Sequence, residues 1–205
     1  VWAWGKNGDG QLGNGTTSTA AYPTKVCKIY STTCEEYLSN IASVHAGDTH
    51  ALAINKDGSA WSWGDNVSGQ LGQGYSASDL SYQPIPSEVC DVGETAPCNT
   101  ANENNLTSIK SGQSIIELSG DLSMVIAEND RLIMWGERQY GQMADGKGGY
   151  YAYPNQVNES GSSLLESVIQ ISAHKEHALA LKTDGTVVAW GKNGSGQLGD
   201  NTTDT

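Results

Sequence analysis

The feature that most constrains this chain is a motif that occurs four times along its length. The first copy reads Val-Trp-Ala-Trp-Gly-Lys-Asn-Gly-Asp-Gly-Gln-Leu-Gly at residues 1–13, and it returns almost unchanged at residues 187–199. Two more copies lie between them, at residues 61–72 and, in a degenerate form, at residues 134–143. Repetition of this kind is typical of proteins built from stacked or radial repeats, so it determines how every other segment is interpreted.

The segments between the copies predict short β-strands. In the second unit, residues 50–54 alternate large and small side chains, and the Asp57-Gly58 pair separates them from a return strand that contains Trp61 and Trp63. An Asp-Gly pair between two such runs is a strong hairpin signal. In the third unit we align Ser123 with His50, which makes the hairpin one residue shorter. Each full unit thus contains about four strands and no helix, as in a propeller blade.

We therefore predict an all-β chain that forms a partial β-propeller of about three to four four-stranded blades. A Pro-x-x-Val sequence ends three of the units and defines the boundaries. The predicted parts of this single domain, 1–205, are a partial blade at 1–26, a blade at 27–89 with an insertion at 27–40, a blade at 90–157 with an insertion at 90–105, and a partial blade at 158–205.

These motifs in combination resemble the regulator-of-chromosome-condensation repeat family. The resemblance rests on His-Ala-Leu-Ala-Leu/Ile, the Asp-Gly turn, Trp-Gly, Asn-x-x-Gly-Gln-Leu-Gly and Pro-x-x-Val, and it covers the chain apart from the insertions. It implies a propeller that is usually seven-bladed. The two ends duplicate one part of a blade, so we expect an incomplete ring whose remaining blades come from a longer chain or from partner chains. Functions within a fold family differ, and none is carried over here.

Composition excludes several partners. The net charge is −12 with only 11 lysines and arginines, whereas binding to nucleic acid depends on cationic side chains that neutralise phosphates. No apolar run is long enough to insert into a membrane.

The sequence shows no catalytic constellation, no metal site and no cofactor motif. His50 and His177 share one strand position and are interpreted as core residues rather than bases. His174 and His177 are three residues apart, so we expect them on opposite faces of one strand, where they are poor co-ligands for a metal.

The cysteines are the most informative departure from the repeat. Both pairs, Cys27 with Cys34 and Cys90 with Cys98, begin directly after a Pro-x-x-Val sequence. Their spacing does not fit a zinc site, and it favours two local disulfide-closed loops on one rim over four unpaired buried thiols. Disulfides persist in oxidising compartments, so this interpretation predicts an extracellular or cell-surface protein.

Binding residues are expected on these loops, because rim loops on a rigid scaffold commonly carry function. The insertions are acidic, and three tyrosines beside Gly148-Gly149 offer an amphipathic surface. The candidate binding residues are Glu35, Glu36, Asp91, Glu94, Glu103, Tyr150, Tyr151 and Tyr153. Of six Asn-x-Ser/Thr sequences, those at Asn105 and Asn158 lie outside the repeated motif and are the preferred glycosylation candidates.

The sequence leads to three functional hypotheses. The first is a non-enzymatic interaction module that binds a protein or a glycan through its rim loops. The second is an intracellular regulatory propeller that promotes guanine-nucleotide exchange, which requires reduced cysteines. The third is a secreted hydrolase or lyase that uses the propeller channel, and only scattered carboxylates support it.

Overall fold

The computed structural model of the chain describes residues 1–31, 33–75, 78, 80–92, 94, 106, 109, 116–146, 148–160 and 163–204. These residues contain only strands, turns and irregular segments, and no helix that could span a membrane. The strands are β1 Trp2–Gly5, β2 Ala20–Lys25, β3 Cys27–Tyr30, β4 Cys34–Tyr37, β5 Ile41–Ala46, β6 His50–Asn55, β7 Ala60–Asp65, β8 Tyr82–Glu88, β9 Ile116–Ser119, β10 Leu122–Ile126, β11 Leu132–Glu137, β12 Tyr150–Gln156, β13 Asn158–Ser160, β14 Ser163–Leu164, β15 Val168–His174, β16 His177–Lys182 and β17 Val187–Gly191.

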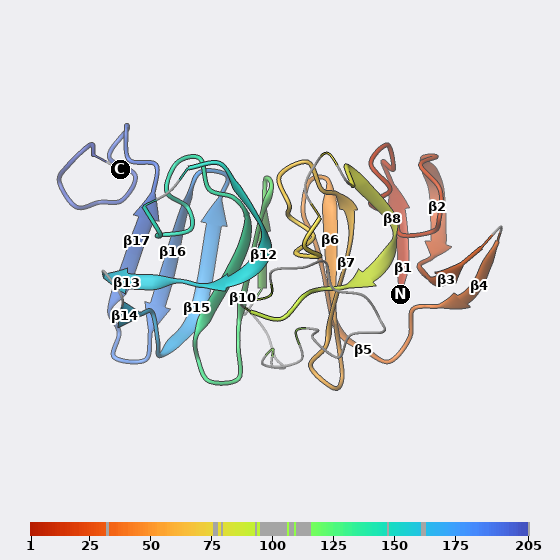
Figure 1. Cartoon of the computed structure of the whole chain (residues 1–205), viewed down its shortest axis with the longest axis horizontal. Coiled ribbons are helices and arrows are strands. Elements are labelled where there is room, and N and C mark those ends of the chain that lie inside the picture. Colours follow the sequence, from red (N-terminus) through yellow and green to blue (C-terminus); the bar gives the residue numbers. More distant parts are fainter. Residues whose placement is uncertain are drawn as a thin grey trace.

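These strands form a row of antiparallel sheets. Two sheets are complete four-stranded blades, with the orders β5-β6-β7-β8 and β9-β10-β11-β12. A three-stranded sheet, β15-β16-β17, and a two-stranded sheet, β1-β2, flank them, and two small hairpins, β3-β4 and β13-β14, extend from the array. Figure 1 shows the sheets one after another along the long axis, without closure into a ring. The predicted all-β, partial-propeller class is confirmed; the domain boundaries remain predictions.

Strand register corrects the alignment of the third blade. Gly64 pairs with His50, Gly136 pairs with Leu122, and Gly191 pairs with His177. The residue equivalent to His50 is therefore Leu122, and the prediction that Ser123 takes this position is wrong. All three hairpins consequently have the same length.

The turn of the third hairpin explains this error. Asp130 adopts φ 59° where Gly58 and Gly185 adopt 87° and 86°. Its N–H donates to the Ala127 carbonyl oxygen at 3.0 Å, as the N–H of Gly58 does to that of Asn55. An aspartate tolerates this left-handed conformation better than most residues do. The turn thus keeps its geometry although its glycine is absent.

Packing between neighbouring sheets explains the alternating large and small residues. Every residue of β10 is buried, whereas β16 alternates between buried and more exposed positions. The main core draws on β6, β10, β11, β16 and β17, and includes Leu52, Met124, Trp135 and Trp190. Strand β10 lies in the middle of the array (Figure 1), so its sheet is covered on both sides. A second, smaller cluster on the β1 side of β6 contains Val26, Ala53, Trp61 and Trp63, so the core consists of two clusters on either side of strand β6.

Candidate functional site

The repeated motif joins each blade to the next. The indole Nε1 of Trp63 donates to the main-chain carbonyl of Gln11 at 2.9 Å, and Trp135 donates to Gln70 at 2.7 Å. Trp190 makes the same bond to Gln142. Glycine follows at close range in two of the copies, because a β-carbon on Gly72 would lie 2.8 Å from Nε1 of Trp135 and one on Gly13 would lie 2.8 Å from Nε1 of Trp63. The third copy carries Ala144 at this position. The motif is therefore a structural joint and not a ligand site.

Asparagines of the motif hold its turn from within. The side-chain oxygen of Asn66 accepts from the Leu71 N–H at 3.1 Å, and that of Asn193 accepts from the Leu198 N–H at 3.0 Å. Asn66 and Asn193 are 1% and 0% exposed, so their sequons follow from the turn and offer no accessible amide for a glycan. Asn158 lies half-buried at the start of β13, and Asn105 lies outside the described residues. Glycosylation at Asn105 and Asn158 remains a prediction.

His50 is a core residue that connects two blades. Its Nε2 lies 2.9 Å from Oγ of Ser123, which donates to the Gln70 carbonyl oxygen at 2.8 Å. The side chain is 1% exposed, and burial lowers the pKa of His50 from 6.5 to about 4. A base held neutral in the interior is structural here, as the sequence predicts.

This burial predicts a pH-dependent stability. Between pH 6.5 and 4 the unfolded chain binds a proton at His50 that the folded chain does not, so stability falls as the pH decreases. The full loss below pH 4 is about 3 kcal/mol from this residue. Denaturant titrations at several pH values should give a smaller slope for His50→Gln. The half-exposed His177 at the equivalent position is the control, and an unchanged slope in His50→Gln would contradict the assignment.

His174 and His177 face each other across the β15–β16 turn, where they form a register pair with ring centroids 6.3 Å apart. The expectation that both lie in one strand on opposite faces is therefore wrong. Among the described residues, no group of three or more histidines, cysteines or carboxylates is placed to hold a metal ion.

The first insertion is a short hairpin, β3-β4, closed by the Cys27–Cys34 disulfide. Its acidic residues lie on strand β4 and already have partners. Lys28 Nζ lies 3.2 Å from a carboxylate oxygen of Glu36, and Ser31 Oγ donates to Glu35. Lys28 therefore offsets one of the two carboxylates, whereas Glu35 is paired with a neutral hydroxyl. We name this hairpin the disulfide hairpin.

The second insertion is described only at its start. Cys90 is disulfide-bonded, while its predicted partner, Cys98, lies outside the described residues, as does Glu103. Asp91 is exposed and caps its own turn through the Val92 N–H at 2.7 Å. The acidic surface predicted for this insertion therefore rests on Asp91 and Glu94 among the described residues.

The three candidate tyrosines lie on strand β12, and not on a loop as expected. Tyr151 and Tyr153 pack edge to face with centroids 6.2 Å apart, and the guanidinium of Arg138 lies 5.1 Å from the Tyr151 ring. Burial raises the pKa of Tyr153, and Tyr151 and Glu94 raise it further. The structure therefore brings Glu94 together with two of the tyrosines, while Tyr150 is 48% exposed.

A row of carboxylates that the sequence did not single out lies at the ends of the β7 and β11 strands. The Gln70 side-chain amide donates to Asp65 at 2.9 Å and to Asp121 at 3.2 Å. Burial, followed by the charges of Asp121 and Asp9, raises the pKa of Asp65. Burial also raises the pKa of Glu137, and the charges of Asp121 and Glu176 raise it further. Sequence distance concealed this cluster, because its members come from different blades.

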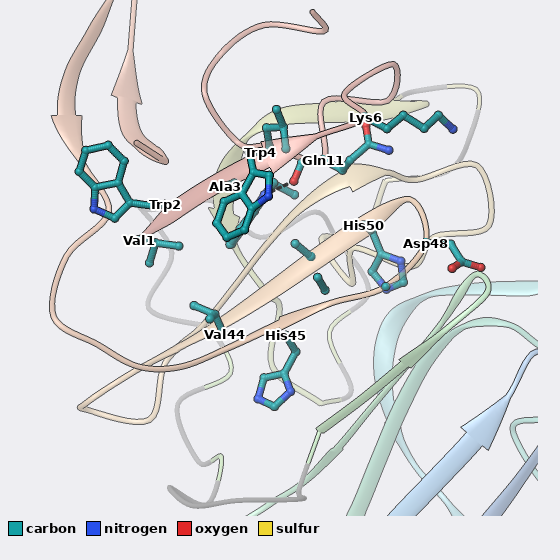
Figure 2. A pocket seen from close by; sticks show the side chains of 15 residues that line it. Val1, Trp2, Ala3, Trp4, Lys6, Gln11, Val44, His45, Asp48 and His50 are labelled. Atoms are coloured by element: carbon teal, nitrogen blue, oxygen red, sulfur yellow. Dashed lines mark hydrogen bonds between the residues drawn. The ribbon is translucent and has the colours of Figure 1, made fainter. Parts of the chain in front are cut away.

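A pocket of about 420 Å³ opens between β1 and the β5–β6 hairpin, which we name the first-sheet pocket. Figure 2 shows Trp4 and Gln11 on its β1 side, and Val44, His45 and His50 on the opposite side. Trp4 is 63% exposed, whereas the equivalent Trp63 is 3% exposed. Strand β7 pairs with β6 and β8, but β1 pairs only with β2. The pocket therefore occupies the place that inner strands take in the other blades.

A second cavity lies on the rim, between the disulfide hairpin and strand β8 of the following blade. Its volume is about 540 Å³, and we name it the hairpin groove. Pockets of this size can hold a small ligand. Its walls combine aliphatic, aromatic and amide side chains: Lys28, Ile29, Trp61, Gln73, Tyr75, Gln83, Ile85, Pro86, Ser87 and Glu88. Sequence reasoning indicated the hairpin but missed the wall of the second blade.

Comparison with known proteins supports this architecture. The chain is 27% identical over 203 residues to human E3 ubiquitin-protein ligase HERC2, covering 99% of this chain and 4% of that protein. It is 27% identical to the ultraviolet-B receptor UVR8 of Arabidopsis thaliana, covering 97% of this chain and 38% of the receptor. The chain therefore spans much less than two thirds of the length of these relatives.

Solved structures show the same fold. Human WBSCR16 superposes with a TM-score of 0.66 at 19% identity, covering 100% of this chain and 45% of that one. Yeast RCC1 (Prp20), in its complex with Kap60, gives 0.64 at 17% identity and covers 100% and 42%. The family model described as the regulator of chromosome condensation (RCC1) repeat matches residues 1–54 and 57–115, more than half of the chain. The chain therefore belongs to the RCC1 repeat family.

Proposed function

We propose that this chain is a non-enzymatic interaction segment of a longer propeller, and that it binds its partner through the rim that contains the disulfide hairpin. The observation that carries this proposal is the hairpin groove of about 540 Å³, which a rim insertion and the next blade form together. The repeat itself does not require this insertion, since blades join through the Trp–Gln bonds. A structure added to a rigid scaffold at an open groove is placed to contact a partner.

We further propose an extracellular or cell-surface location. The Cys27–Cys34 bond and the disulfide-bonded Cys90 support it, because disulfides are rare in reducing compartments. Alkylation of free thiols with a maleimide during denaturing lysis of the native cells, counted by mass spectrometry of the isolated protein, tests this location. Undetectable free thiol is expected. Four reactive thiols would contradict it and would instead favour the intracellular regulatory alternative, for which accelerated nucleotide release from a small GTPase is the readout.

Removing the hairpin disulfide should weaken the rim more than the array. The Cys27→Ala/Cys34→Ala variant is expected to lose about 2 to 3 kcal/mol of stability, because a loop with a sequence separation of 7 is no longer closed. Urea denaturation followed by circular dichroism measures this loss for wild type and variant, each with and without reductant, since reductant also breaks the bond of Cys90. A difference between wild type and variant that disappears in reductant identifies the Cys27–Cys34 bond as its cause, whereas no difference without reductant would exclude the predicted stabilisation.

Partner binding tests the functional proposal directly. Fluorescently labelled protein should bind intact cells. A Cys27→Ala/Cys34→Ala variant in which a short glycine turn also replaces residues 28–33 should bind at least about tenfold more weakly. A Tyr22→Ala variant provides the control, since Tyr22 is 82% exposed on β2 and does not line the groove. Binding that is unchanged by removal of the hairpin would contradict its role.

A further inference from the structure

We propose that the hairpin groove is a saccharide-binding site in which Gln73 and Tyr75 are the specificity-determining residues. The inference rests on the proposed interaction role and names the chemical class of its ligand. Three observations support it: the forced orientation of a buried amide, the departure of two wall residues from the repeat, and the mixture of apolar faces and polar tips along the walls.

The orientation of the Gln73 amide follows from its neighbours. Its Nε2 lies 3.1 Å from the Ser62 carbonyl oxygen and 3.4 Å from that of Ser87, and both oxygens can only accept. The Ser62 hydroxyl, 3.0 Å away, donates its proton to Leu71 and therefore also accepts. The amide nitrogen must point to this side.

Its oxygen is consequently left on the other side. Oε1 of Gln73 is buried without a hydrogen-bond partner, although the residue is only 2% exposed. Buried acceptors are almost always satisfied in proteins. Because Gln73 lines the hairpin groove, this unsatisfied acceptor lies beside the cavity, and a small shift of the side chain would let a ligand in the groove donate to it.

The repeat shows that Gln73 is a local departure. Asn14 and Asp200 occupy the equivalent positions of the first and last copies, and each accepts from a threonine two residues later, at Thr16 and Thr202. These short side chains stabilise their own turn. In the second blade the same two positions carry Gln73 and Tyr75, and both line the groove. Both substitutions replace the residues that form the hydrogen bond of this turn, and both new residues line one cavity. Together they indicate a role in binding.

The remaining walls supply apolar faces beside polar groups. Trp61 lines the groove and is 8% exposed, while Ile29 on the disulfide hairpin is 47% exposed. Nζ of Lys28 lies 6.0 Å from the centroid of the Trp61 ring. A saccharide ring matches this pattern, because its hydroxyls both donate and accept while its C–H face covers an aromatic surface.

Strand β8 argues against an extended peptide as the occupant. It lies at the edge of its sheet and carries Pro84 and Pro86, which have no N–H to pair with an added strand. Gln83, which also lines the groove, donates to Ser87 at 3.1 Å. Recognition in the groove must therefore depend on side chains, which suits a neutral sugar.

Saturation-transfer NMR on the full chain, with methyl glycosides of glucose, galactose, mannose and N-acetylglucosamine as probes, tests the site. At least one glycoside should give a signal, and titration should show about tenfold weaker binding for Tyr75→Ala and for Gln73→Met. Tyr22→Ala should bind as wild type does, since Tyr22 is exposed on β2 and does not line the groove. Tyr75→Ala leaves every hydrogen bond of Gln73 in place, so it remains informative if Gln73→Met unfolds.

Three outcomes would overturn the inference: no response to any glycoside, unchanged affinity in Tyr75→Ala, or a proline-rich peptide that binds the groove in place of a sugar. Hairpin-dependent binding to cells without any saccharide response would remove this inference and leave the proposed function standing. Saccharide binding by a protein whose cysteines are reduced in its native cells would leave this inference standing and remove the proposed extracellular location, since the saccharide titration does not depend on location.

Discussion

Replacing Trp135 by alanine is expected to lower the free energy of unfolding by about 3 to 5 kcal/mol, the largest effect of any single side-chain truncation in the array. Trp135 is 0% exposed, and its indole contributes both core packing and the 2.7 Å bond to the Gln70 carbonyl. Truncation therefore leaves a large cavity and removes the joint between the second and third blades. Denaturant unfolding followed by far-ultraviolet circular dichroism measures the loss.

Trp4 provides the matched control. It occupies the same motif position but is 63% exposed, so Trp4→Ala is expected to cost less than about 1 kcal/mol. Because repeat arrays can unfold blade by blade, hydrogen exchange at β10 and β11 should locate the change. Similar losses in the two variants would contradict the assignment of the joint.

The second large loss of stability is expected when a single methyl group is added in the Gly136→Ala variant. Gly136 has φ +106°, and a β-carbon there would lie 2.1 Å from the carbonyl oxygen of Asp121. Gly5 has the same φ of +106° with no atom within 4 Å of its β-carbon position. Both alanine variants carry the backbone strain of about 1 to 3 kcal/mol. Gly136→Ala should cost about 3 kcal/mol more, because a main-chain carbonyl within a sheet cannot move aside easily.

Comparing Gly5→Ala with Gly136→Ala by the same denaturation experiment isolates the steric contribution. Equal losses would show that backbone conformation alone selects glycine after the tryptophan. A larger loss for Gly136→Ala would show that close contact with the adjacent inner strand selects it. The two positions differ in this way because β1 pairs only with β2, so Gly5 faces no such strand.

Much of the blade could be predicted from the sequence because it depends on short-range patterns. Hairpins follow from Asp57-Gly58 and Asp184-Gly185, and strands follow from the alternation in residues 50–54 and 177–181. The cysteine pair at residues 27 and 34 indicated a local loop, and the structure forms that bond. These features need only neighbours along the chain, which the sequence displays directly.

The third blade shows where such reasoning fails. Alignment of the repeat letters made Ser123 the equivalent of His50, yet the hydrogen-bonded register shows that Leu122 occupies this position. Strand pairing is set by the turn, and Asp130 adopts the glycine conformation without being glycine. Similarly, the three tyrosines at residues 150, 151 and 153 belong to a strand because β11 pairs with them. Their own sequence does not indicate this pairing.

The repeat, the all-β class, the family and the position of the disulfide hairpin could be predicted from the sequence, because each depends on residues within one blade or on a comparison between blades. Packing between blades determines which tryptophans are buried, which carboxylates gather around Gln70, and that Gln73, beside a groove, keeps a side-chain oxygen without a partner. These properties depend on contacts between segments that are distant along the chain. They exist only when one blade is packed against the next.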